Sequence, residues 1–190
     1  SNNEYASLEQ EKVKLLPVFE NENKLNFIKQ QLNKMEVETI NILSPYFDKN
    51  GSIIQQLKSQ YPKASINVIM DIQHGLLPYN LDTKGINIYD WSKVNETKEN
   101  EFSRLHGKLI SFEIKAGDEY ILQGSSNATS AALGCDKQNS TNQELNIWLC
   151  SSKKDTILNR LGINLNDDAR INSEDLIEKE NQIKSSSERP

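Results

Sequence analysis

A histidine and a lysine stand two residues apart in RLHGKLISFEI, a segment whose apolar residues predict a strand. His106 and Lys108 then share one face of that strand, because successive side chains alternate between its two faces. An imidazole beside an ammonium group suits a nucleophile or acid–base group next to a cation that stabilises an anionic centre. The pair therefore indicates chemistry on an anion.

A second polar group follows the next predicted strand, in the segment GSSNATSAAL. Gly124 allows a tight exit from the strand, and Ser125 and Asn127 share a face. The helix expected from Ala128 adds backbone N–H groups and the positive end of its dipole. Together with the lysine, these elements predict a phosphate site that extends to the N–H groups near Thr129.

Two carboxylates accompany these segments. Glu144, close to Asn142 at the start of the predicted strand ELNIWLC, can bond one ring nitrogen of His106 and fix its tautomer. Glu113 has an odd spacing from His106, which predicts that it lies on the opposite face of its strand. We therefore expect Glu113 to have a structural role at the sheet edge.

Taken in order, these residues resemble the phospholipase D superfamily, whose motif is H-x-K, four residues, Asp, then a gap and G-S-x-N. Here His106 opens the motif, Glu113 replaces the Asp, and GSSN follows after a longer gap. Glu144 matches the acidic residue that the family often has on the next strand. The resemblance covers residues 15–150 and looks closest to bacterial domains of helicase-linked or restriction-type proteins, which carry similar SPYFD and GSxN-T segments.

The resemblance implies a metal-independent phosphodiesterase that uses no cofactor. One motif histidine forms a phosphohistidine and another protonates the leaving oxygen. The implied catalytic residues are His106, Lys108 and Glu144, and the implied phosphate-binding residues are Lys108, Ser125 and Asn127. Because the family needs two motifs per site and this chain carries one, the second H-x-K motif is expected from a homodimer mate or from another part of a longer protein.

The resemblance implies a nuclease domain of a larger DNA-processing protein, with DNA or another phosphodiester as its substrate. The alternative is a degenerate member that binds nucleic acid or mediates assembly without catalysis. A lipid phospholipase ranks last, because the chain lacks the aromatic and apolar stretches of an enzyme that acts on lipid surfaces.

Helical and strand patterns alternate early in the chain, and strands cluster later. This order predicts an α/β fold, a mixed sheet with helices on both faces, as in one half of a phospholipase D-like fold. The predicted helices cover 24–35, 52–61, 128–134 and 153–162, and the predicted strands cover 39–45, 65–71, 86–91, 107–114, 119–124 and 144–150. His74 follows a strand end, where sites often form, but is interpreted as an ordinary loop histidine.

The composition limits the remaining possibilities. The chain has 190 residues with 22 basic and 27 acidic side chains and a net charge of -5, which excludes attachment to nucleic acid by bulk charge. It has no apolar run long enough for a membrane span, and we expect a cytoplasmic location. Two cysteines cannot make a disulfide framework, and two histidines cannot make a His-rich metal site.

Three regions are expected along the chain. Residues 1–14 read as a tag remnant and lead-in, because the sequence opens with SNNEY, and residues 15–163 form the phospholipase D-like domain. From Asn164 onward, seven acidic and four basic residues surround only scattered apolar ones. Such a composition predicts an acidic, disordered linker or tail over residues 164–190.

Overall fold

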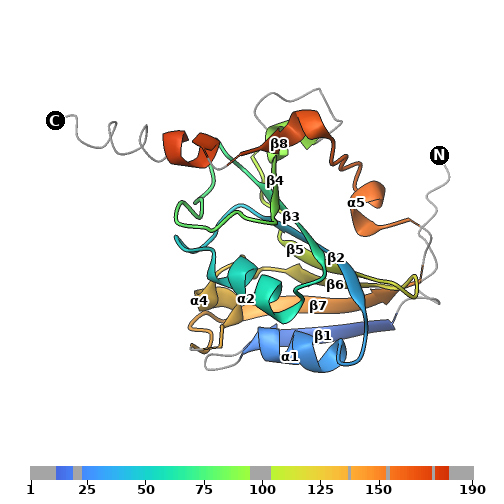
Figure 1. The fold of residues 1–190 in the computed structure, drawn as a ribbon. Coiled ribbons are helices and arrows are strands. Elements are labelled where there is room, and N and C mark those ends of the chain that lie inside the picture. Colours follow the sequence, from blue (N-terminus) through green and yellow to red (C-terminus); the bar gives the residue numbers. More distant parts are fainter. Residues whose placement is uncertain are drawn as a thin grey trace, which may run out of the picture.

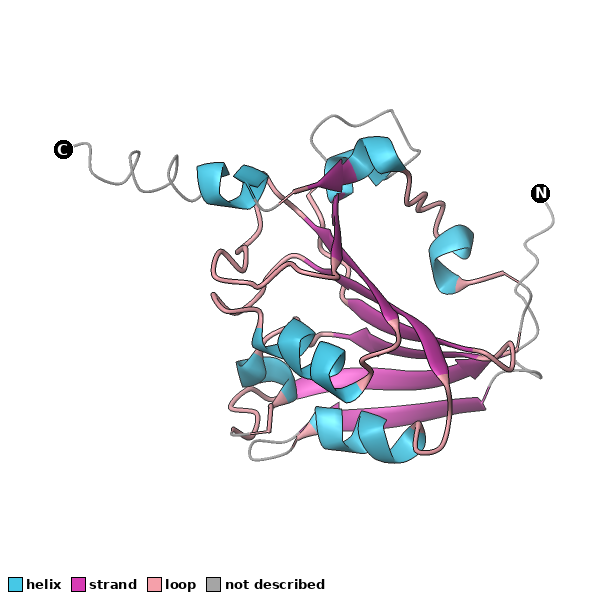
Figure 2. Cartoon of the chain, viewed as in Figure 1, coloured by secondary structure: helices cyan, strands magenta, loops and turns pink. Residues whose placement is uncertain are grey.

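Eight strands form one mixed sheet in the order β1–β7–β6–β5–β2–β3–β4–β8 (Figures 1 and 2). The computed structural model describes residues 12–18, 23–94, 104–136, 138–152, 155–172 and 174–179. The strands are β1 (Lys12–Val18), β2 (Val37–Ser44), β3 (Ser65–Met70), β4 (Asn87–Asp90), β5 (Leu109–Ile114), β6 (Glu119–Gly124), β7 (Glu144–Ser151) and β8 (Arg170–Ile171). The helices are α1 (Lys24–Gln31), α2 (Ser52–Gln60), α3 (Trp91–Val94), α4 (Ser130–Leu133) and α5 (Ile157–Arg160), with a 3₁₀ helix η2 (Asp167–Ala169).

Parallel and antiparallel pairing divide the sheet into two parts. β2, β3 and β4 pair in parallel, and α2 makes the crossover from β2 to β3. Parallel neighbours need such a crossover, and the apolar, β-branched residues of these strands suit a sheet that is covered on both faces. From β2 to β5, β6, β7 and β1 the pairing is antiparallel, with a tight turn joining β5 to β6.

Helices cover both faces of the sheet, which confirms the predicted α/β class (Figure 1). The apolar side chains of α1, α2 and α4 pack on one face, and those of α3, α5 and η2 pack on the other. The first core contains Ile28, Ile40, Ile42, Ile54, Leu57, Phe112 and Trp148. The second contains Leu43, Ile69, Leu105, Leu109, Ile121 and Leu158.

The end of the described chain differs from the expected disordered tail. β8 pairs antiparallel with β4, and the Asn164 N–H donates to the Val94 carbonyl at 3.0 Å. In the helical turn over residues 174–179, Leu176 is 2% exposed. The expectation for 164–190 is therefore wrong for the described part of this region, because pairing with the edge strand β4 orders residues whose local composition carries no strand signal. Residues 180–190 lie outside the described residues.

Several element bounds also need correction. β1 begins at Lys12, inside the expected lead-in, and the sequence patterns did not predict it. The helix expected over 24–35 ends at Gln31, as α1. The helix expected over 153–162 is reduced to the four residues of α5. Polar residues follow Leu32 after α1. Thr156 caps the start of α5, where its side chain accepts from the Asn159 N–H, and Gly162, with a positive φ of 67°, follows its end.

Candidate functional site

The two segments with the candidate chemistry meet where β5 begins and β6 ends, at one end of these neighbouring interior strands. The Gly124 N–H donates to the Lys108 carbonyl at 3.4 Å, and the register continues with Leu109 opposite Gln123. On the other side of β5, Leu109 lies opposite Leu43, so β2 ends beside the start of β5. The H-x-K segment and the GSSN segment are thus neighbours in space, as the sequence predicted.

Close backbone approach explains the glycine at the end of β6. A Cβ atom on Gly124 would lie 2.2 Å from the Leu145 carbonyl oxygen and 2.7 Å from the Asn146 Cα. These atoms belong to the neighbouring strand β7 and have no room to shift. Only glycine lets β6 leave the sheet this close to β7 and direct the GSSN segment toward the H-x-K segment.

Gly124→Ala is expected to destabilise the protein by about 1–3 kcal/mol, because the added methyl group overlaps backbone atoms of β7. Urea denaturation measures the free energy of unfolding. Gly117→Ala is the matched control, since its Cβ would meet nothing within 4 Å and only its positive φ of 97° would be strained. A Gly124→Ala variant no less stable than the control would contradict this account of the strand exit.

His106 and Lys108 precede β5 in an irregular segment over residues 104–108 instead of lying on the strand itself. His106 is exposed, and Lys108 is half-buried. The Lys108 Nζ donates to the His106 carbonyl at 3.0 Å, which holds the ammonium group beside the histidine. A pocket of about 340 Å³ adjoins Lys108 and is lined by Leu43, Gly107, Lys108, Leu109, Gln123, Gly124, Ile147 and Leu161.

Glu144 has other partners than the expected one. Its carboxylate accepts a short hydrogen bond from the Ser125 hydroxyl and a 3.1 Å bond from the Asn142 amide. The Leu145 N–H also donates to the Ser125 hydroxyl oxygen, at 2.9 Å, so this side chain lies against the start of β7. No bond from Glu144 to His106 is found among the described residues. The expectation that Glu144 orients the imidazole is therefore wrong in this structure.

The expected anion site at the start of α4 is also corrected. Four N–H groups there already donate to protein acceptors: Ala128 to the Ser44 hydroxyl at 3.1 Å, Thr129 to the Asn127 carbonyl at 2.8 Å, Ser130 to the Asp48 carboxylate at 2.7 Å, and Ala132 to the Thr129 hydroxyl at 3.3 Å. A helix N-terminus binds an anion only through N–H groups that are free. The remaining candidates for phosphate contact are the side chains of Lys108 and Asn127. The Asn127 Oδ1 atom is buried and accepts no hydrogen bond from the described residues.

A buried aspartate close to the H-x-K segment was not singled out from the sequence. Asp71 directly follows β3 and is 5% exposed. Its Oδ1 atom accepts the His74 N–H at 2.9 Å and lies 3.3 Å from the His74 Nδ1 atom, while its Oδ2 atom accepts the Leu105 N–H at 3.0 Å. A carboxylate just past the end of a parallel strand, three residues before a histidine, was the signal that could have identified it.

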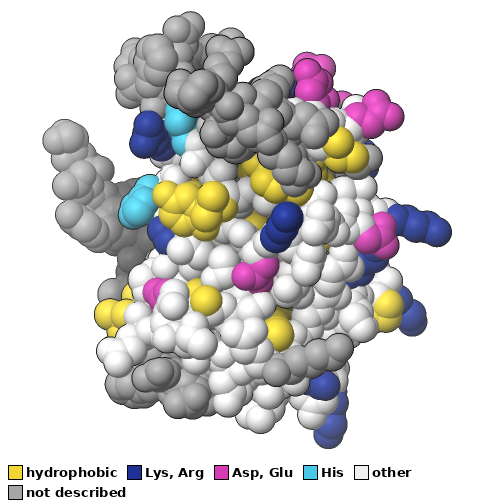
Figure 3. Space-filling view, turned by 90° about the vertical axis from the view of Figure 1, so that its left-hand side faces the viewer, with side chains coloured by type: hydrophobic (Ala, Val, Ile, Leu, Met, Phe, Trp, Pro, Cys, Tyr) yellow, Lys and Arg dark blue, Asp and Glu magenta, His cyan; other side chains and the backbone are white. Residues whose placement is uncertain are grey.

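Both histidines of the chain lie on one face of the molecule, shown in Figure 3 (cyan) beside exposed hydrophobic side chains. The exposed apolar residues Tyr46 and Leu76 belong to neighbouring segments joined by a parallel bridge. His74 was expected to be an ordinary loop histidine, but both its N–H and its ring contact the Asp71 carboxylate.

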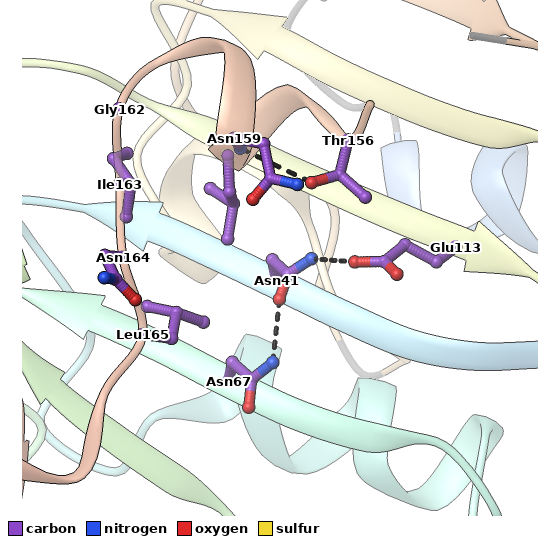
Figure 4. Close-up of a pocket in the computed structure, with 10 residues that line it drawn as sticks. Asn41, Asn67, Glu113, Thr156, Asn159, Gly162, Ile163, Asn164 and Leu165 are labelled. Atoms are coloured by element: carbon purple, nitrogen blue, oxygen red, sulfur yellow. Dashed lines mark hydrogen bonds between the residues drawn. The ribbon is translucent and has the colours of Figure 1, made fainter. Parts of the chain in front are cut away.

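Glu113 lies on the interior strand β5, so its expected place at a sheet edge is wrong, although its structural role is supported. Its carboxylate accepts from the Asn41 amide at 2.8 Å. The hydrogen bonds continue across the sheet as an asparagine chain in which Asn67 donates to Asn41, Asn87 donates to Asn67, and Arg170 donates to Asn87. Figure 4 shows the part of this chain from Asn67 to Glu113. The chain joins five adjacent strands on the face covered by α5.

A second pocket, of about 650 Å³, separates the asparagine chain from the segment after β7 (Figure 4). It is lined by Asn41, Asn67, Glu113, Thr156, Leu158, Asn159, Gly162, Ile163, Asn164 and Leu165. The Asn41 amide donates both to Glu113 and to the Ser111 hydroxyl, at 3.2 Å, so its hydrogen atoms are satisfied by the protein. This pocket lies on the middle of the sheet face, away from the start of β5, where His106 is found.

Burial raises the pKa of Glu119, whose Oε1 atom has no hydrogen-bond partner among the described residues. Its other oxygen accepts the Ile157 N–H at 2.8 Å. A carboxyl whose pKa is higher in the folded than in the unfolded state stabilises the fold fully below its unfolded pKa, and this contribution is lost as the pH rises through the folded value.

Glu119→Gln is therefore expected to flatten the decline in the free energy of unfolding as the pH rises from the ordinary Glu range, about 4.3, toward neutrality. The glutamine carbonyl keeps an acceptor for Ile157. Urea denaturation at several pH values measures the effect, with Glu36→Gln, an exposed carboxylate paired with Lys115, as the control. Parallel pH profiles for wild type and Glu119→Gln would refute the assignment to Glu119.

No protein-family profile and no curated protein matches the sequence. Solved structures do. The nuclease Nuc of Salmonella typhimurium, a phospholipase D family member, has a TM-score of 0.49 at 14% identity over 76% of this chain and 85% of that chain. NucT from Helicobacter pylori has a TM-score of 0.47 at 14% identity over 79% and 91%. Yeast tyrosyl-DNA phosphodiesterase has a TM-score of 0.46 at 16% identity over 73% and 31%.

Neither a metal-binding cluster nor a membrane-spanning helix is found among the described residues. No three His, Cys, Asp or Glu side chains there gather in a way that could hold a metal ion. None of the helices in the same residues is long and apolar enough to cross a membrane.

Proposed function

We propose that this chain is a metal-independent phosphodiesterase of the phospholipase D type, a cytoplasmic nuclease domain of a larger DNA-processing protein. The observation that carries the proposal is that the H-x-K and GSSN segments meet at one end of β5 and β6, where the Gly124 N–H donates to the Lys108 carbonyl. The order and spacing of these residues in the sequence resemble the family motif. The pairing of β5 with β6 makes the two segments neighbours, and an open pocket adjoins Lys108 and Gly124.

In the proposed reaction a ring nitrogen of His106 attacks phosphorus, and the bond from phosphorus to the leaving oxygen breaks. Water then attacks the phosphohistidine, the P–N bond breaks, and His106 is released. Lys108 stabilises the charge on the phosphoryl oxygens, and the Asn127 amide contacts the same oxygens. Ser125 and Glu144, which are bonded to each other, act as positioning residues for the GSSN segment.

The resemblance gives the substrate class, and the charge of the chain limits how it contacts a polyanion. The chain has a net charge of -5, so contact with a polyanion depends on the local cation at Lys108 and not on the whole surface. We expect DNA binding by this chain to be weak and to fall steeply with salt. The motif resemblance assigns the second histidine of the reaction to a homodimer mate or to another part of a longer protein.

Two observations favour the second candidate, a degenerate domain that binds nucleic acid or mediates assembly. The Glu144 carboxylate is bonded to Ser125, and the N–H groups at the start of α4 are already paired. Both features reduce the number of groups free to hold a phosphate.

Cleavage in the presence of EDTA separates the two functions. Wild-type protein is incubated with single-stranded DNA and with bis(p-nitrophenyl) phosphate, and product release is measured at several protein concentrations. The proposed function predicts cleavage that survives chelation. Bound DNA without turnover of either diester would favour the degenerate domain.

A further inference from the structure

One buried carboxylate connects both histidine segments of this chain. The Oδ1 atom of Asp71 is bound by the His74 N–H at 2.9 Å and lies 3.3 Å from the His74 Nδ1 atom. Its Oδ2 atom accepts the N–H of Leu105, the residue before His106, at 3.0 Å. Asp71 thus fixes the position of His74 relative to the segment that carries His106, and Figure 3 shows both imidazoles on the same face.

Displacement of an alkoxide from phosphorus needs a proton donor at the leaving oxygen. In the proposed reaction His106 is occupied as the nucleophile. The Lys108 ammonium donates to the His106 carbonyl, and the Glu144 carboxylate accepts from Ser125 and Asn142. The sequence contains two histidines, so His74 is the other imidazole of the chain.

We propose that His74, in place of the histidine of a second H-x-K motif, is the general acid of this reaction, so that both histidines come from the same chain. The inference rests on the proposed function. An ionised carboxylate only accepts, so the 3.3 Å contact with Asp71 assigns a proton to His74 Nδ1 and leaves Nε2 as the atom that delivers the proton. The side chain is 33% exposed. The Asp71 carboxylate, 7% exposed, orients the ring.

The proton balance closes over the two steps. As the His106 nitrogen bonds to phosphorus, His74 Nε2 gives its proton to the leaving oxygen, and an alcohol departs. In the second step water gives a proton back to His74 Nε2 while its oxygen bonds to phosphorus and the P–N bond breaks. Both histidines return to their starting states, and one water molecule is consumed for each diester that is cleaved.

The loop that carries His74 is held tightly against the end of β2. The Gly75 N–H donates to the Asp71 carbonyl at 2.8 Å, and the Leu76 N–H donates to the Pro45 carbonyl at 3.0 Å. A Cβ atom on Gly75 would lie 2.5 Å from the Pro45 oxygen and 2.6 Å from the Asp71 oxygen. Such close approach fixes the backbone on both sides of the imidazole, as a positioned acid requires.

The test compares two leaving groups in EDTA. His74→Gln is assayed on a dinucleoside phosphate, which releases an alkoxide, and on thymidine 5′-(p-nitrophenyl phosphate), which releases a phenolate that needs little protonation. We expect a loss of about 100-fold or more in kcat on the first and less than about 5-fold on the second. His74→Asn is the second variant, and Gln73→Ala, the exposed neighbour in the same turn, is the control expected to keep full activity on both.

An equal loss on both substrates, or no loss on either, would overturn the assignment of His74. In the second case the acid comes from another chain or segment, and the proposed function still stands if His106→Ala loses both activities. Activity that survives His106→Ala would instead refute the proposed function. Thermal unfolding of each variant identifies losses that arise from misfolding.

Discussion

His106→Ala is expected to reduce phosphodiester cleavage by at least about 10⁴-fold on every substrate, because the nucleophile itself is removed. The leaving group should make no difference to this loss, in contrast to the pattern predicted for His74→Gln. The side chain is exposed, so the fold should tolerate the change. Product release from DNA and from a p-nitrophenyl diester measures the effect.

Imidazole added to the His106→Ala protein provides a chemical control. If the lost group is a nucleophile, free imidazole in the space it leaves is expected to restore part of the cleavage of the p-nitrophenyl diester. Unchanged activity in His106→Ala, with a normal thermal unfolding transition, would remove this residue from the mechanism.

Lys108→Met is expected to lower kcat by about 10²–10³-fold, since the ammonium group stabilises charge that develops on the phosphoryl oxygens. Its bond to the His106 carbonyl is exposed, so the stability should change little. Lys108→Arg keeps the charge and is expected to retain part of the activity.

Lys115→Met is the matched control for this variant. Lys115 follows β5 at the opposite end of the strand and pairs with the exposed Glu36 carboxylate at 3.1 Å. Removing it takes the same charge from the protein at a distance from the candidate site. Equal activities for Lys108→Met and Lys115→Met would show that Lys108 has only a general effect of charge.

The sheet was predictable because its strands carry strong local signals. The apolar, β-branched runs around Ile42 and Val68 and the glycine turn at Gly117 placed β2, β3, β5 and β6 within a few residues of their observed bounds. β8 and the helical turn around Leu176 were missed because tertiary pairing and burial order them, while their own composition is polar and acidic.

The sequence predicted which segments of the candidate site lie together. It did not predict the hydrogen-bond partners of the individual residues. Spacing predicted that the H-x-K and GSSN segments adjoin a pair of neighbouring strands, and the register of β5 with β6 agrees, although His106 lies before β5 and the GSSN segment continues past the end of β6. The partners of Glu144 and of the N–H groups at α4 depend on where three loops fold against one another, which no local pattern encodes. Asp71 was missed because its importance comes from Leu105, a residue 34 positions further along the chain.

Covalent trapping on His106 tests the central claim most directly. Protein is mixed with thymidine 5′-(p-nitrophenyl phosphate), quenched in alkali to preserve an acid-labile phosphoramidate, digested and examined by mass spectrometry. The account predicts a thymidine phosphate adduct on the peptide that contains His106, formed as p-nitrophenolate is released and absent in His106→Ala. Turnover with an adduct on a different residue, or an adduct that persists in His106→Ala, would contradict the account.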